Sequence, residues 1–128
     1  MNTKELRVGN YVEVDGAIVE VGAICSDKED HIEIKVSADK KNEINITKVK
    51  PVPLTGELLS KCCEFDNDGK HVIGIDEHRH FLKIQNGYVI LLNYKNEEMI
   101  HFWDVQSLHQ LQNLYYALKN KELTMDIN

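Results

Sequence analysis

The fold is decided by residues 79–94, RHFLKIQNGYVILLNY, because this stretch predicts two strands joined by a tight turn. Asn86-Gly87 is a strong hairpin signal, since both residues accept the left-handed backbone that a type I′ turn requires. An apolar run follows the turn at 88–92. We therefore expect antiparallel strands at 79–85 and 88–94.

Two further strands flank this hairpin in the sequence. Residues 71–75 precede it and residues 97–103 follow it, and both are separated from it by polar turns at 76–78 and 95–96. Short connections of this kind join neighbouring antiparallel strands. The second half of the chain therefore predicts a four-stranded antiparallel meander.

A helix is expected on each side of this meander. Two prolines in Lys50-Pro-Val-Pro-Leu54 hold the chain extended, and Thr55 then fits the N-cap of a short helix. Ser107 and Gln110 match a capping box at the start of a final helix, and Asn120 fits its left-handed end. An apolar stripe at helical spacing supports the final helix; it consists of Leu108, Leu111, Leu114, Tyr115 and Leu118.

The first half of the chain predicts short strands. Asp15-Gly16 is a tight-turn dipeptide, and apolar residues alternate with polar ones around it. The alternating positions are Leu6, Val8, Val12, Val14, Val19, Val21, Ile32, Ile34, Val36, Ile44 and Ile46. Four or five strands in about 50 residues are typical of a small antiparallel β-barrel or meander.

The expected fold class is therefore α+β. We expect a small, barrel-like all-β subdomain at residues 1–50. Residues 51–128 would form an α-ββββ-α subdomain packed against it, because residues 88–92 are apolar on both faces. The sequence leaves open whether the halves are separate domains or one continuous sheet system.

Composition narrows the class of protein. The chain has 128 residues with 42% apolar and 28% charged side chains, which is typical of a folded globular protein. The net charge of −6 disfavours a general nucleic-acid binder. The longest apolar run has five residues, whereas a membrane span needs about 20, so we expect a cytoplasmic protein with no membrane partner.

The three cysteines, Cys25, Cys62 and Cys63, form a poor disulfide framework, because their number is odd and two are adjacent. We expect them to be reduced and to serve packing. Cys62 and Cys63 lie near the end of the expected short helix, where the helix dipole disfavours a thiolate nucleophile.

Three stretches together point to a family. They are ELRVGNYV at 5–12, VKPVPLT at 49–55 and LHQLQNLYYAL at 108–118. In this order they resemble a family of small hypothetical proteins of gut Bacteroidales, often encoded on phages, prophages or integrated mobile elements. The resemblance spans most of the chain and is loose between Cys62 and Phe102. The family has no established activity, so the resemblance implies a context, a phage-derived accessory protein, and no site residues.

The final helix carries the first candidate site. Residues 109–118 contain no charged side chain, which is unusual for a surface helix. Charge depletion and tyrosine enrichment are typical of protein interfaces. We expect a surface for a protein partner or for self-association, formed by His109, Gln112, Asn113, Tyr115 and Tyr116. The alternative is that the polar members hydrogen bond within the fold.

Two other patterns suggest different chemistry. His78 and His80 are two residues apart, so both imidazoles would point to one side of a strand and could bind a metal. A basic cluster on the N-terminal strands could contact nucleic acid, although strand-edge lysines usually serve solubility. Its members are Lys35, Lys40, Lys41, Lys48 and Lys50.

The sequence therefore favours a non-enzymatic protein-interaction or accessory factor with no catalytic residues and no cofactor. A nucleic-acid-associated module using the basic N-terminal strands is the alternative. A small metal-dependent hydrolase around His78 and His80 is less favoured, because only two ligands are in view.

Overall fold

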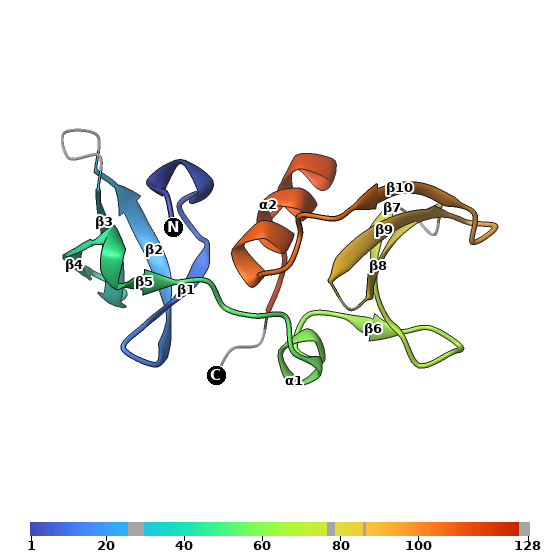
Figure 1. Ribbon diagram of the computed structural model, residues 1–128, viewed down its shortest axis with the longest axis horizontal. Helices are drawn as coiled ribbons and strands as arrows, with labels where there is room; N and C mark the ends of the chain where they lie inside the picture. The colour runs from blue at the N-terminus through green and yellow to red at the C-terminus, as the bar shows by residue number, and fades with distance from the viewer. Residues whose placement is uncertain (26–29, 77–78, 86, 126–128) are drawn as a thin grey trace. The chain divides into compact units, whose positions relative to one another are not determined.

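A computed structural model describes residues 1–25, 30–76, 79–85 and 87–125. Two five-stranded antiparallel sheets, a short helix and a C-terminal helix make up the described chain, which confirms the α+β class (Figure 1). The chain divides into two compact units. Unit 1 comprises 1–53 and 107–113, and unit 2 comprises 54–106 and 114–128.

Unit 1 contains the sheet with strand order β4-β3-β2-β1-β5. Its elements are η1 (Thr3–Glu5), β1 (Tyr11–Val14), β2 (Ala17–Ile24), β3 (His31–Ser37), β4 (Lys40–Asn45), η2 (Ile46–Lys48) and β5 (Val49–Lys50). The turn at Asp15-Gly16 is confirmed, since both residues have positive φ (51° and 82°). Of the two forms expected, barrel or meander, the closed barrel is wrong, because the sheet is open with β4 and β5 at its two ends. Strands β1 to β4 follow one another as a meander.

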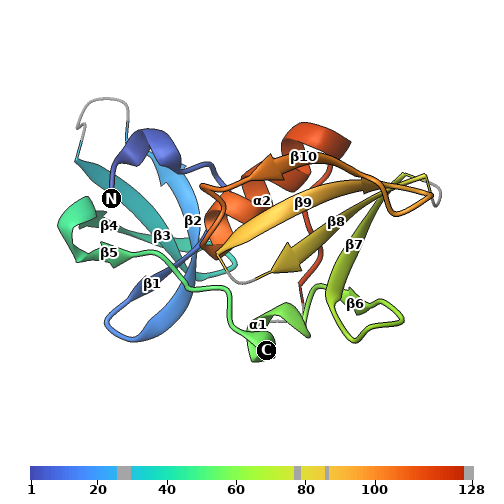
Figure 2. The ribbon, with the colours of Figure 1, turned by 45° about the vertical axis from the view of Figure 1, so that its right-hand side comes forward.

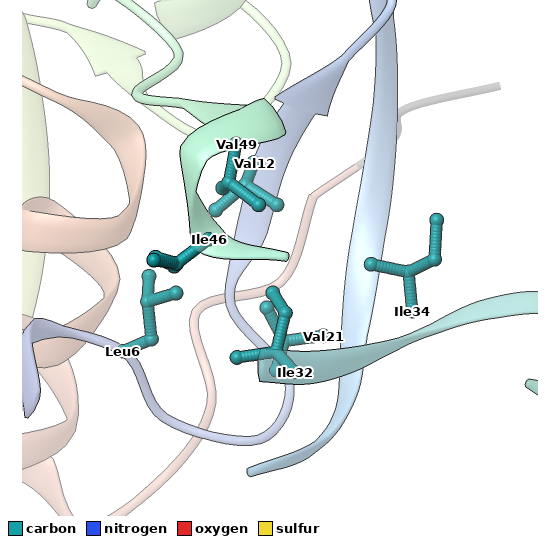
Figure 3. Packing of buried hydrophobic residues seen from close by; sticks show 7 residues of the cluster. All are labelled: Leu6, Val12, Val21, Ile32, Ile34, Ile46 and Val49. Atoms are coloured by element: carbon teal, nitrogen blue, oxygen red, sulfur yellow. The ribbon is translucent and has the colours of Figure 1, made fainter. Parts of the chain in front are cut away.

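The core of unit 1 is aliphatic. Figure 3 shows the side chains that meet there: Leu6, Val12, Val21, Ile32, Ile34, Ile46 and Val49. Leu6 and Val8 were expected in a strand, but neither lies in one. Asn2 instead forms a capping box that starts the 3-10 turn η1, and Leu6 ends that turn. The side chain of Leu6 is still buried in the core, so its apolar character was a correct guide to burial.

Unit 2 contains the second sheet, with strand order β10-β9-β8-β7-β6 (Figure 2). Its elements are α1 (Gly56–Leu59), β6 (Glu64–Phe65), β7 (His71–Asp76), β8 (His80–Gln85), β9 (Tyr88–Asn93) and β10 (Glu98–Phe102). The predicted meander therefore gains a fifth strand, β6, which is too short to show periodicity. Phe65 in β6 is exposed.

The helix caps follow the sequence. The Thr55 hydroxyl accepts a hydrogen bond from Leu58 N–H (3.2 Å), which is the expected N-cap of α1. Helix α2 (Leu108–Lys119) follows Ser107, whose N–H donates to Gln110 Oε1 (3.1 Å). Asn120 has φ of 55°, as expected for a left-handed helix end.

Candidate functional site

The amide of Gln112 is a structural clamp within unit 1. Its Oε1 accepts from the backbone N–H of Tyr11 (2.8 Å), and its Nε2 donates to the carbonyl of Gly9 (3.1 Å). The side chain is 1% exposed. Both of its polar atoms thus bind the segment that leads into β1. This agrees with the alternative given above, in which the polar residues of the final helix hydrogen bond within the fold.

Asn113 extends this clamp. Its Oδ1 accepts from Asn10 Nδ2 (2.8 Å) and Arg7 Nε (3.2 Å), and its Nδ2 donates to the carbonyl of Glu5 (3.0 Å). Asn10 is fully buried and uses its own Oδ1 to accept from Arg7 N–H (2.7 Å). Two asparagines and one glutamine therefore hold residues 5–11 against the first turns of α2.

His109 is also buried, with 2% of its surface exposed. Its Nδ1 lies 3.1 Å from Ser107 Oγ, and its Nε2 lies 3.6 Å from Glu5 Oε1, beyond hydrogen-bonding distance. Burial lowers the pKa of His109, and the nearby Glu5 carboxylate only partly opposes this effect. The neutral imidazole is therefore favoured in the folded chain.

The remaining members of the predicted partner surface lie on the part of α2 that belongs to unit 2. Tyr115 is half-buried, and Lys119 Nζ lies 5.9 Å from the centre of its ring. Tyr116 is exposed. The five residues expected to form one surface therefore differ in environment: His109 and Gln112 are inside unit 1, Asn113 is half-buried and hydrogen bonded there, and Tyr116 reaches solvent.

The lysines of the basic cluster do not gather at one place. Lys35 and Lys41 are cross-strand neighbours on β3 and β4, and Lys40 adjoins them. Lys35 forms an ion pair with Glu20, which holds its pKa above the usual value. Lys48 and Lys50 lie on η2 and β5, and β5 is at the opposite end of the sheet from β4.

The histidine pair is described only in part, because His78 lies outside the described residues. His80 Nδ1 donates to Asp76 Oδ2 (2.9 Å), and this bond lowers the pKa of Asp76. Within the described ranges, no group of three or more His, Cys, Asp or Glu side chains is placed to hold a metal ion.

A hollow of about 740 Å³ lies in unit 2. Its walls combine the apolar side chains of Leu59, Ile84 and Val105 with polar groups from Lys70 and His71. The buried Nε2 of His71 has no hydrogen-bond partner. Because that atom is shielded from solvent, a molecule in the hollow would not reach it. The lining of the hollow therefore does not indicate a particular reaction.

The edge strand β10 is the most distinctive surface of unit 2. It lies at one edge of the sheet, and among the described strands it pairs only with β9. Met99 and Ile100 are 52% and 47% exposed, and the strand carries one charged residue, Glu98. Edge strands usually carry lysine, proline or a very short length to prevent pairing with another chain. Edge strand β4 has two lysines, whereas β10 has none.

A β-bulge sets the faces of β10. Glu98 is paired with Leu92 and Ile100 with Leu91, so Met99 is the extra residue. The bulge brings Glu98 and His101 to one face, where His101 Nε2 donates to Glu98 Oε2 (3.0 Å). Ile100 points to the other face. The strand thus offers an apolar centre flanked by an acidic and an imidazole group.

An aromatic cluster continues from the end of β10. The ring of Trp103 is 63% exposed and lies 4.6 Å from that of Tyr88 and 5.2 Å from that of His101, centre to centre. Exposed tryptophan and tyrosine are enriched among the residues that dominate binding energies. The sequence predicted a strand here but missed this surface, because neither the edge position nor the bulge is visible in residue periodicity.

No protein-family model matches the chain, and comparison with curated proteins and with solved structures likewise finds no similar protein. In the part of the chain that the structure describes, no helix combines the length and apolar character needed to cross a membrane.

Proposed function

We propose that the chain is a non-enzymatic interaction protein that associates with a second copy of itself through the edge strand β10. The observation that carries the proposal is the self-complementary pattern of the strand. Exposed Ile100 lies at its centre, Glu98 precedes it and His101 follows it along the strand. An extended strand that pairs with an open sheet edge gains main-chain hydrogen bonds, and its side chains give specificity.

The register of such a pair follows from the bulge. In an antiparallel pair with a two-fold axis at Ile100, this residue faces its own copy. Glu98 of each copy then lies opposite His101 of the other, on the same face of the sheet. In the dimer the imidazole N–H of His101 can donate to Glu98 of the other copy in place of the bond within its own strand, and directly facing polar pairs contribute roughly 0.2–1 kcal/mol each. The symmetric interface makes this contact twice.

The exposed apolar area beside β10 also supports a second copy of the chain as the partner. Met99 and Trp103 are both more than half exposed and adjoin the strand edge. A pair of five-residue strands buries less than the roughly 1,000 Å² expected for a stable interface, so the association should be weak and concentration-dependent. A weak homotypic contact fits an accessory factor, the context that the family resemblance implies.

Sedimentation velocity over a concentration series up to about 1 mM tests this proposal. We expect the wild-type chain to shift from monomer towards dimer as concentration rises, and Ile100→Lys to remain monomeric because two ammonium groups would meet at the axis. Val36→Lys introduces the same charge at a similarly exposed valine in unit 1 and should leave the dimer unchanged.

A charge exchange tests the register. Glu98→Lys and His101→Glu each place like or unmatched groups opposite one another and should weaken the dimer. The double variant restores two opposite-charge pairs and should recover it. Strictly monomeric wild-type protein at all concentrations, or equal association of Ile100→Lys, would contradict the proposal.

A further inference from the structure

The adjacent cysteines that follow α1 form a compact pair. The backbone N–H groups of Cys62 and Cys63 both donate to the carbonyl of Leu59, at 3.1 and 2.8 Å. This tight turn brings the two side chains together, and their Sγ atoms are 3.5 Å apart. Both residues are half-buried.

This separation suits chelation better than a disulfide. A relaxed disulfide requires a Cα–Cα distance of at least about 4.4 Å, whereas neighbouring Cα atoms across a trans peptide are about 3.8 Å apart. Two sulfurs bound at about 2.3 Å to one centre stand about 3.3 to 3.8 Å apart for bond angles of about 90° to 110°, which covers pyramidal and tetrahedral centres. The observed 3.5 Å lies within that range.

The two thiols are hydrogen bonded to each other, and either sulfur can be the donor. A centre that binds both sulfurs replaces this contact and takes the place of one proton on each thiol.

A second hollow, of about 350 Å³, adjoins Cys62. Val72 and Phe81 give it apolar wall, and Lys119 lies at its border. The hollow has room for a substituent on an atom bound to the sulfur of Cys62.

We propose that Cys62 and Cys63 form a two-thiolate site for a trivalent thiophilic centre of the arsenic(III) class, whose third substituent occupies this hollow. Zinc commonly takes three or four protein ligands. The described residues offer no group of three or more candidate ligands, so the pair suits a centre that needs only two. The site is independent of association through β10.

The reaction is a ligand exchange without a change of oxidation state. With phenylarsonous acid, the hydrated form of phenylarsine oxide, each thiol proton passes to one arsenic-bound hydroxyl. Two As–S bonds replace two As–O bonds, and two water molecules leave. The phenyl group stays on arsenic as the third substituent.

Titration of the full chain with phenylarsine oxide, followed by intact mass and thiol counting, tests the site. We expect one phenylarsenic group per chain and the loss of two of three titratable thiols. Cys62→Ser and Cys63→Ser should each weaken binding at least ~100-fold, because the second bond is no longer intramolecular. The matched variant Cys25→Ser, in unit 1, should bind as the wild type does.

A comparison with the unfolded chain separates a preformed site from mere proximity in sequence. The folded protein should bind phenylarsine oxide at least ~10-fold more tightly than the chain in concentrated urea, because folding already sets the sulfur spacing. Equal affinity in the two states would overturn the proposal, as would single-cysteine variants that bind like the wild type.

Discussion

Replacing Gln112 by methionine should destabilise unit 1 by about 2 to 3 kcal/mol. Methionine has a similar length but removes both hydrogen bonds, so the Tyr11 N–H and the Gly9 carbonyl each lose the bond to residue 112. An unsatisfied buried polar group costs about 1 to 3 kcal/mol. Tyr11 and Gly9 are only half-buried, so water can reach them in part, and the lower end of the range applies to each.

Amide hydrogen exchange measured by NMR reports this loss directly. If the Tyr11 amide exchanges through opening of unit 1, 2 to 3 kcal/mol corresponds to an acceleration of about 30- to 150-fold. Gln112→Glu keeps an acceptor for Tyr11, and Gln85→Met makes the matched change in unit 2. A change of less than about threefold at Tyr11 in Gln112→Met would refute the clamp.

Three further predictions concern stability and are checked by urea unfolding. Burial lowers the pKa of His109, so the unfolded chain takes up the proton at a higher pH than the folded chain does. The free energy of unfolding should therefore fall as pH drops below about 6.5, by at most ~1.4 kcal/mol per pH unit from His109. His109→Gln should reduce that slope, and an identical slope in the variant would contradict the prediction. Gly16→Ala should cost about 1 kcal/mol or more, since φ is +82°, whereas Gly56→Ala should be neutral or stabilising; equal effects would argue against strain at the turn. Thr55→Ala should cost about 1 kcal/mol through loss of the α1 cap, and Thr55→Ser should not; a neutral alanine variant would count against the cap.

Local features of the fold were predictable from the sequence. The Asp15-Gly16 turn, the Thr55 cap and the left-handed Asn120 each depend on the backbone preference of one or two residues, and each is confirmed. Alternation also located strand β3, because one face of its first half is buried. Such signals are encoded within a few residues of the feature they determine.

Long-range features were not predictable. The barrel prediction failed because alternation shows that strands exist but not whether the outermost pair, β4 and β5, meet. The bonds from Gln112 to residues 9 and 11 span a sequence separation of 101 or more. A helix face without charged residues is compatible both with a partner surface and with side chains that hydrogen bond inside the fold, as Gln112 does.

The surface of β10 illustrates the same limit. A strand at 97–103 was expected, and β10 confirms it apart from its end residues. Its place at the end of the sheet depends on the pairing of all five strands. The bulge at Met99, which brings Glu98 and His101 to one face, depends on the pairing with β9. Periodicity in a single stretch carries neither piece of information.

Amide exchange along β10 at low and high protein concentration tests self-association at this edge most directly. Raising the concentration should slow exchange at Ile100 and its neighbours, while the edge strand β4 serves as an internal reference and stays unchanged. Exchange in β10 that is independent of concentration, under conditions where the chain is shown to dimerise, would place the contact elsewhere and contradict the proposed role of this strand.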